Sequence, residues 1–199
     1  MSGPRRPALA LLLSFTLTLG AATPAAAEDE LTYEPWPHAA VTTGIGLLVG
    51  AEVLLRDQLA PTSCNLCGTN AFDRSITETL AWQNHHLATT LSDAGLLLLP
   101  VSAVSYGFAQ GGWEDGAIDA LVLGEAIGVN FLVTELLKFA IARERPMIRY
   151  LPADDPKVSR KPEDWYVSLP SGHASTSFVT VAALATIADL RGRDPTPIW

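Results

Sequence analysis

The sequence predicts an all-α protein, a helical domain that follows a secretory signal peptide. Apolar residues recur at helical spacing in four long segments, and neither strand-like alternation nor an internal repeat occurs. The chain has 199 residues, of which 48 % are hydrophobic and 17 % are charged. This length is sufficient for one domain with a hydrophobic core, so we expect a single domain.

The N-terminus has the parts of a secretory signal peptide. Arg5 and Arg6 precede an apolar run, and a run of alanines ends at Ala27. We predict a signal peptide over residues 1–27, cleaved near Ala27. The remaining residues, 28–199, are then an exported domain, located in the periplasm or at a membrane surface that faces it.

The spacing of apolar residues predicts four long helices and one short helix. In the short helix, Phe72, Ile76 and Leu80 share one face. Glycines separate the second long helix from the third, and a polar segment punctuated by prolines predicts a loop over residues 147–167. The predicted long helices cover residues 38–56, 87–109, 117–145 and 172–190, and the short helix covers about 70–82.

The charges inside these helices argue against simple membrane spans. A spanning helix needs about twenty apolar residues, and only the segment Ala94–Trp113 lacks charge for that length. The other long helices carry charged residues in their interiors, namely Glu52, Asp119, Glu125, Glu135 and Lys138. We therefore expect a soluble or peripherally attached bundle, with integral membrane contact as the alternative.

The net charge narrows the classes of ligand. With a formal charge of -8, the chain has no Lys/Arg stripe that could displace counterions from nucleic acid. Nucleic acid is therefore not an expected partner. An anionic substrate would need a local cluster of cations.

The two cysteines, Cys64 and Cys67, lie in the segment SCNLCGTN. In an oxidising compartment this spacing indicates a local disulfide that pins a loop. A zinc site would need two more ligands, and the candidates His85 and His86 are adjacent rather than three to five residues apart. A thioredoxin-like redox role is disfavoured because no βαβ pattern surrounds the pair.

Two cations near the end of the third long helix could bind an anion. Lys138 and Arg145 are seven positions apart, which brings both to one face of a helix that Pro146 is expected to end. An arginine fork and a lysine point charge suit a phosphate group. The alternative for Lys138 is an ordinary ion pair with Glu135, and for Arg145 a solvated helix-terminal cation.

The segment SLPSGHAS, residues 168–175, begins the fourth long helix. Ser171 is suited to cap this helix, and Gly172 lets a ligand approach the free amides of the first turn. His173 could then donate a proton to a departing oxygen. The alternative is a plain helix cap followed by a surface histidine.

Taken together, the two segments resemble a known family. KFAIARERP, which ends at Pro146, and LPSGHAS, which begins 23 positions further at Leu169, are similar to the first two motifs of the type 2 phosphatidic acid phosphatase (PAP2) family. That family also holds class A acid phosphatases and vanadium haloperoxidases. The resemblance implies a helical bundle in which phosphate binds to Lys138, Arg145, Ser171 and Gly172, and in which His173 protonates the leaving group.

The family's third motif does not occur in this sequence. That motif is a serine–arginine pair followed by a histidine, which attacks phosphorus, and an aspartate, which orients it. The residues after His173 contain no histidine, and the segment SRKPEDWY has Tyr166 where the histidine is needed. The other histidines, His38, His85 and His86, have no matching context. We therefore expect a chain cut before the third motif, a bundle that lacks one or two helices, and little hydrolysis.

The resemblance implies a phosphatase that hydrolyses phosphate monoesters, either a lipid phosphate or a soluble one, when the third motif is supplied. A non-catalytic helical protein that binds phosphate or a partner is the main alternative. A vanadium haloperoxidase is a further alternative, although it needs the same histidine. No metal or other cofactor is implied for a phosphatase, because cationic side chains take that role.

Overall fold

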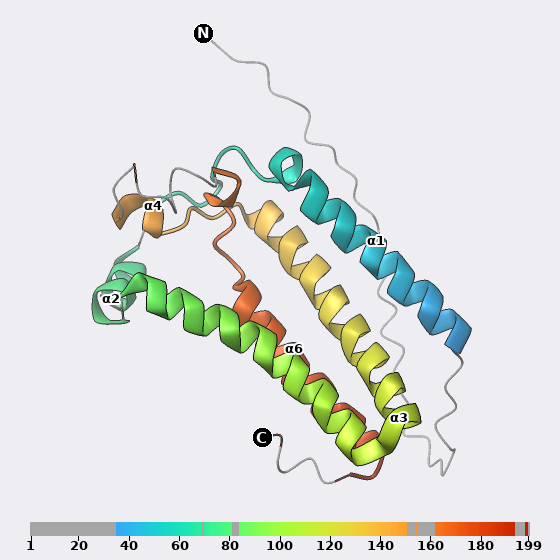
Figure 1. Cartoon of the computed structure of the whole chain (residues 1–199). Helices are drawn as coiled ribbons and strands as arrows, with labels where there is room; N and C mark the ends of the chain where they lie inside the picture. Colours follow the sequence, from blue (N-terminus) through green and yellow to red (C-terminus); the bar gives the residue numbers. More distant parts are fainter. Residues whose placement is uncertain are drawn as a thin grey trace, which may run out of the picture. The chain divides into compact units, whose positions relative to one another are not determined.

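The structure is a computed structural model that describes residues 35–68, 70–80, 84–150, 154, 162–193 and 198. The predicted signal peptide lies outside these residues. Within them the fold is all-α, as the sequence predicts, and the only extended pairing is an isolated parallel bridge between Leu66 and Arg143. The elements are α1 (Pro35–Leu59), α2 (Ala71–Leu80), α3 (His85–Ile141), α4 (Met147–Tyr150), the 3-10 helix η1 (Pro162–Asp164) and α6 (Gly172–Leu190) (Figure 1).

The second and third predicted long helices form one element, α3, with a sharp kink. Gly112 has φ 67° and ψ -160°, a conformation that glycine adopts far more readily than other residues. Residues 85–111 and 113–141 therefore form two arms that meet at the kink and diverge from it (Figure 1). The side chain of Asn84 caps the first arm by accepting a hydrogen bond from Leu87 N, at 3.0 Å.

The second arm ends earlier than the sequence predicts. We expected the helix to continue to Arg145, but its last residue is Ile141. Ala142 has a left-handed backbone with φ 46°, and its N–H donates to Lys138 O at 2.9 Å, which closes the final turn. The helix therefore stops well before Pro146, and Arg145 lies in the connection that follows.

The buried core is small and lies where the two arms of α3 meet α6. Ala103 from the first arm, Leu123 from the second arm and Ile187 from α6 form its centre. Figure 1 shows α1 running beside the second arm. Two arginines that follow α6 hold the kinked end, because Arg191 Nε and Arg193 Nη1 lie 2.7 and 2.8 Å from the two carboxylate oxygens of Asp119.

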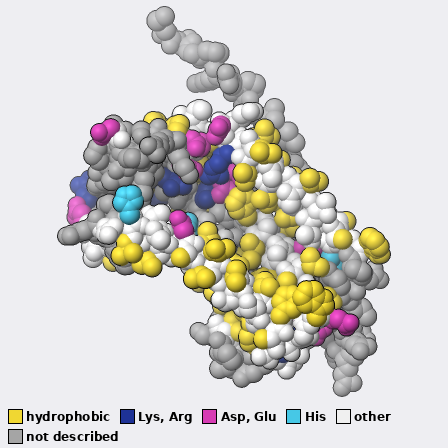
Figure 2. Space-filling view, viewed as in Figure 1, with side chains coloured by type: hydrophobic (Ala, Val, Ile, Leu, Met, Phe, Trp, Pro, Cys, Tyr) yellow, Lys and Arg dark blue, Asp and Glu magenta, His cyan; other side chains and the backbone are white. Residues whose placement is uncertain are grey.

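The long helices keep extensive apolar faces at the surface (Figure 2). Many of these exposed residues lie on α1 and α3, among them Leu47, Leu54, Leu97, Trp113 and Leu136. Among the residues that the structure describes, three helical stretches are long and apolar enough to cross a membrane, namely Trp36–Leu59, His86–Ile141 and Gly172–Leu190. The helices are therefore compatible with membrane association.

The interior charges that argued against membrane spans are paired within the fold. Glu125 lies 3.1 Å from His38 of α1, Asp119 pairs with the two arginines that follow α6, and Glu135 pairs with Lys138. Charged residues inside membrane helices face neighbouring helices and pair there. The sequence pattern alone could not reveal this pairing, so the charges do not count against membrane contact.

Candidate functional site

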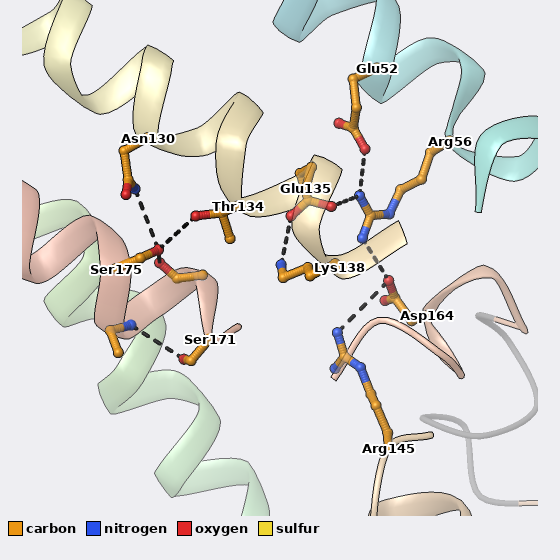
Figure 3. A network of polar contacts seen from close by, with 12 residues as sticks. Glu52, Arg56, Asn130, Thr134, Glu135, Lys138, Arg145, Asp164, Ser171 and Ser175 are labelled. Atoms are coloured by element: carbon orange, nitrogen blue, oxygen red, sulfur yellow. Dashed lines mark hydrogen bonds and ion pairs between the residues drawn. The ribbon is translucent and has the colours of Figure 1, made fainter. Parts of the chain in front are cut away.

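One cavity brings together the five residues that the sequence predicts to bind phosphate and donate a proton. It has a volume of about 380 Å³ and lies between the end of α3 and the start of α6. Several of the surrounding residues are labelled in Figure 3. The lining consists of Lys138, Arg145, Pro146, Val167, Ser168, Pro170, Ser171, Gly172 and His173.

Lys138 is a buried cation that points at the start of α6. A β-carbon at Gly172 would lie 3.3 Å from Lys138 Nζ, so the ammonium group faces this glycine directly. The same Nζ donates to Glu135 Oε1 at 2.6 Å. The i,i+3 ion pair that the sequence offered as an alternative is therefore present, together with the position beside the cavity.

The turn at Ser171 has the predicted capping geometry. Ser171 has an extended backbone, and its side chain accepts a hydrogen bond from Ala174 N at 3.3 Å. Gly172 is the first residue of α6. The first-turn amides and the positive end of the helix dipole are thus next to Lys138 Nζ, which is a favourable arrangement for an anion.

Hydrogen bonds from Ser175 tie the first turn of α6 to the second arm of α3. Ser175 Oγ lies 3.1 Å from Thr134 Oγ1 and accepts from Asn130 Nδ2 at 3.4 Å. It also donates to Gly172 O at 3.1 Å. This cluster, drawn in Figure 3, couples the position of the turn to the helix that carries Lys138.

Arg145 reaches the cavity by a different route from the one that the sequence predicts. Since it lies beyond the end of α3, the seven-residue helical spacing from Lys138 does not place it. Its N–H donates to Trp165 O at 2.8 Å, and the preceding Glu144 N–H donates to Leu66 O at 3.1 Å. Two segments distant in sequence therefore hold this connection from either side.

The Arg145 guanidinium is only partly neutralised. Its Nη2 lies 3.9 Å from Asp164 Oδ1. Its Nε is buried and has no hydrogen-bond partner among the residues that the structure describes. A buried donor without a partner is unfavourable, and an anion in the cavity could supply the missing acceptor.

Arg56 of α1 connects the carboxylates that accompany both cations (Figure 3). It donates to Glu52 and Glu135 at 2.7 Å each and to Asp164 at 3.1 Å. Our sequence analysis missed Arg56 and Asp164. The available signal was a Glu/Arg pair at i,i+4 near the end of an otherwise apolar helix.

His173 has a carboxylate partner that the sequence analysis also missed. His173 Nε2 lies 2.9 Å from Asp93 Oδ1, a residue of the first arm of α3 that is 80 positions away. Both side chains are substantially exposed. Such a carboxylate orients the imidazole ring that it contacts.

The cysteine loop braces the connection that leads to Arg145. Cys64 and Cys67 form a disulfide, and Asn65 N–H donates to Ala142 O at 2.9 Å. Gly68 N–H donates to Glu144 Oε2 at 2.6 Å, and Arg149 Nη2 lies 2.9 Å from the same oxygen. The hydrogen bond from the Gly68 amide holds the pKa of the Glu144 carboxyl below its ordinary value, and Arg149 contributes to the same effect.

His38 does not line this cavity. The His38 ring pairs with Glu125, near the middle of the second arm. In the portion of the chain that the structure describes, no three His, Cys, Asp or Glu side chains are grouped to hold a metal ion.

A family model described as the PAP2 superfamily matches residues 119–197. Comparison with curated proteins and comparison with solved structures found no match. The matched segment contains every residue that lines the cavity, whereas Arg56, the disulfide loop and Asp93 lie before it. Residues 119–197 are therefore similar to the PAP2 superfamily, the family that the two motifs resemble.

Proposed function

We propose that this protein binds phosphate monoesters in the cavity between α3 and α6 and is a phosphatase of the PAP2 type. The observation that carries the proposal is the convergence of Lys138, Arg145 and the Ser171–His173 turn on one cavity. The family match independently supports a phosphatase-family function.

In this proposal the phosphoryl oxygens are bound by groups of three kinds. The Arg145 guanidinium offers a fork of donors, including the buried Nε that has no partner in the described part of the chain. Lys138 adds a point charge, and the first-turn amides beginning at Gly172 add neutral donors aligned with the helix dipole. Ser171 caps that turn and keeps those amides in place.

His173 is proposed to be the general acid. It lines the same cavity as the anion-binding groups, so an imidazolium there can give its proton to the leaving oxygen. The carboxylate of Asp93, 2.9 Å from Nε2, holds the ring in its orientation.

Turnover also needs a nucleophile. The family's third motif, which supplies one, does not occur in the sequence. We therefore propose that the described cavity residues carry the binding of phosphate esters, and that turnover requires the third motif as well. A non-catalytic phosphate-binding protein is the second candidate, because His173, which the proposal uses as the acid, is the one histidine in the described lining of the cavity.

The cellular setting is part of the proposal. The apolar faces of α1, α3 and α6 support attachment to a membrane, and the cavity lies between the end of α3 and the start of α6. A phosphate on a lipid and a phosphate on a soluble molecule would present the same group to the cavity. We further propose export to the periplasm, which N-terminal sequencing would test by showing a mature chain that starts at Glu28.

The direct test is binding of inorganic phosphate and of vanadate, measured by calorimetry. We expect wild type to bind both and Arg145→Ala to bind each roughly 10- to 100-fold more weakly, since a charge-assisted hydrogen bond is lost. Arg74→Ala, which removes an exposed arginine of α2, is the matched control. Equal affinities of wild type and Arg145→Ala would refute the proposed site.

Catalysis is tested with p-nitrophenyl phosphate. The polypeptide is assayed beside a version extended with a third-motif segment. Turnover only by the extended version supports the phosphatase proposal. Phosphate binding without turnover by either version would favour the non-catalytic candidate.

A further inference from the structure

We infer that Arg56 is a positioning residue for phosphate binding, and that α1 therefore completes a site whose binding groups all lie in the PAP2 segment. The inference rests on the proposed function, because it concerns the same cavity. Arg56 itself does not line that cavity. It acts through the two carboxylates that accompany Lys138 and Arg145.

Arg56 is bonded to three carboxylates from three different parts of the chain. Its Nη1 donates to Glu52 Oε1 within α1 and to Glu135 Oε2 on the second arm of α3, each at 2.7 Å. Its Nη2 donates to Asp164 Oδ1 of η1 at 3.1 Å. One guanidinium group thus fixes α1, α3 and η1 relative to one another (Figure 3).

Two of these carboxylates each accompany one cation of the cavity. The other oxygen of Glu135 accepts a hydrogen bond from Lys138 Nζ at 2.6 Å. The Asp164 oxygen that binds Arg56 also lies 3.9 Å from Arg145 Nη2. Arg56 therefore shares one carboxylate with each of the two cations that are proposed to bind phosphate.

The charges in this network balance. Three cations, Arg56, Lys138 and Arg145, face three carboxylates, Glu52, Glu135 and Asp164. Glu135 is only 4 % exposed and Lys138 only 8 % exposed, so water screens their charges weakly. Loss of Arg56 would leave one excess negative charge beside the cavity.

This excess charge would weaken phosphate binding in two ways. The unpaired carboxylates would draw Lys138 and Arg145 toward themselves and away from the cavity. They would also repel the anion. Glu52 reinforces the effect, since its Oε2 is buried without a partner in the described residues and its other oxygen depends on Arg56.

The shape of the arginine side chain matters as well as its charge. A planar guanidinium can donate along several directions at once, whereas a lysine ammonium on a flexible stem cannot span the same three partners. The Arg56 guanidinium carbon also lies 5.9 Å from the ring centroid of Phe139, the residue next to Lys138. The contact further aligns Arg56 with the end of α3.

The test measures inorganic phosphate and vanadate binding by the full chain with substitutions at Arg56. We expect Arg56→Met to weaken binding roughly 10- to 100-fold, and Arg56→Lys to recover only part of that loss. Circular dichroism checks that each variant is folded, and Arg56→Lys keeps the charge if Arg56→Met is unstable. Arg191→Met, which breaks a comparable carboxylate network at the kinked end, is expected to bind like wild type.

A double mutant separates positioning from a general loss of structure. In the Arg56→Met background, Glu135→Gln removes the excess negative charge and is expected to restore part of the phosphate affinity. A variant that is merely misfolded would not be rescued in this way.

The outcomes distinguish the inference from the proposed function. If wild type does not bind phosphate, both are refuted. If wild type binds and Arg145→Ala does not, while Arg56→Met and Arg56→Lys bind like wild type, only the role of Arg56 is refuted. Equal weakening by Arg191→Met and Arg56→Met, without rescue by Glu135→Gln, would also refute it.

Discussion

Replacing Gly172 by alanine should separate phosphate binding from stability. Gly172 begins α6 and does not have a positive φ, so an alanine is compatible with the backbone. Its new methyl group would lie 3.3 Å from Lys138 Nζ. This is closer than the ordinary contact distance between such atoms, about 3.5 to 4.0 Å.

The ammonium group cannot move aside without cost. Lys138 Nζ is held 2.6 Å from Glu135 Oε1, so the new methyl group would press against an ammonium group that already has a partner. If one charge-assisted hydrogen bond to phosphate is lost, the cost is about 1.5 to 3 kcal/mol. This corresponds to a dissociation constant roughly 10- to 100-fold higher.

The stability of the fold should be unchanged in Gly172→Ala or slightly higher than in wild type. Alanine is favoured over glycine by about 1 kcal/mol in a helix interior and by less in a first turn. Gly124→Ala, on the second arm of α3, is the matched control because a β-carbon there has nothing within 4 Å. Calorimetry with phosphate and thermal unfolding by circular dichroism measure the two effects. If Gly172→Ala binds phosphate as tightly as Gly124→Ala, then Lys138 and the turn do not share a ligand.

Three further predictions concern the parts that support the cavity. Cys67→Ser should reduce the free energy of unfolding by about 2 kcal/mol, as expected for a short disulfide loop. It should also weaken phosphate binding in calorimetry, because the loop holds the connection to Arg145. Unchanged phosphate affinity would contradict this role of the loop. The lowered pKa of Glu144 predicts stability that is present above its ordinary value of 4.5 and is lost as the pH falls through the lower folded-state value; denaturant unfolding between pH 6 and about 3 should show a flatter profile for Glu144→Gln. Gly116→Ala should destabilise the chain by about 1 to 3 kcal/mol in thermal unfolding, because its methyl group would lie 2.7 Å from Phe108 Cα across the kink. If Gly116→Ala melts at the same temperature as wild type, the two arms of α3 are not in such close contact at this point.

The existence of the helices and the identity of the cavity residues could be predicted from sequence because both depend on local patterns. The apolar spacing that defines α1 and α6 is a property of a few neighbouring turns. Ser171 caps α6 through a hydrogen bond that spans three residues. The order and spacing of the two motifs identified Lys138, Arg145 and the turn before any tertiary contact was known.

The route by which Arg145 reaches the cavity could not be predicted in the same way. Helical spacing from Lys138 placed it correctly beside the cavity but for a reason that the structure overturns. The helix ends at Ile141, and contacts with Leu66 and Trp165 hold the connection that follows. Whether a helix continues for one more turn depends on such contacts, which outweigh the small differences in helix propensity.

The sequence by itself determined that this protein is helical and which residues carry the predicted phosphate chemistry. Only the tertiary structure decided how those residues are held. Arg56 meets Glu135 across 79 positions and Asp164 across 108, and His173 meets Asp93 across 80. The periodicity of the sequence cannot reveal pairs that are so far apart. Such pairs depend on how the helices pack and on the turn of the chain at Gly112, rather than on the residues adjacent in sequence.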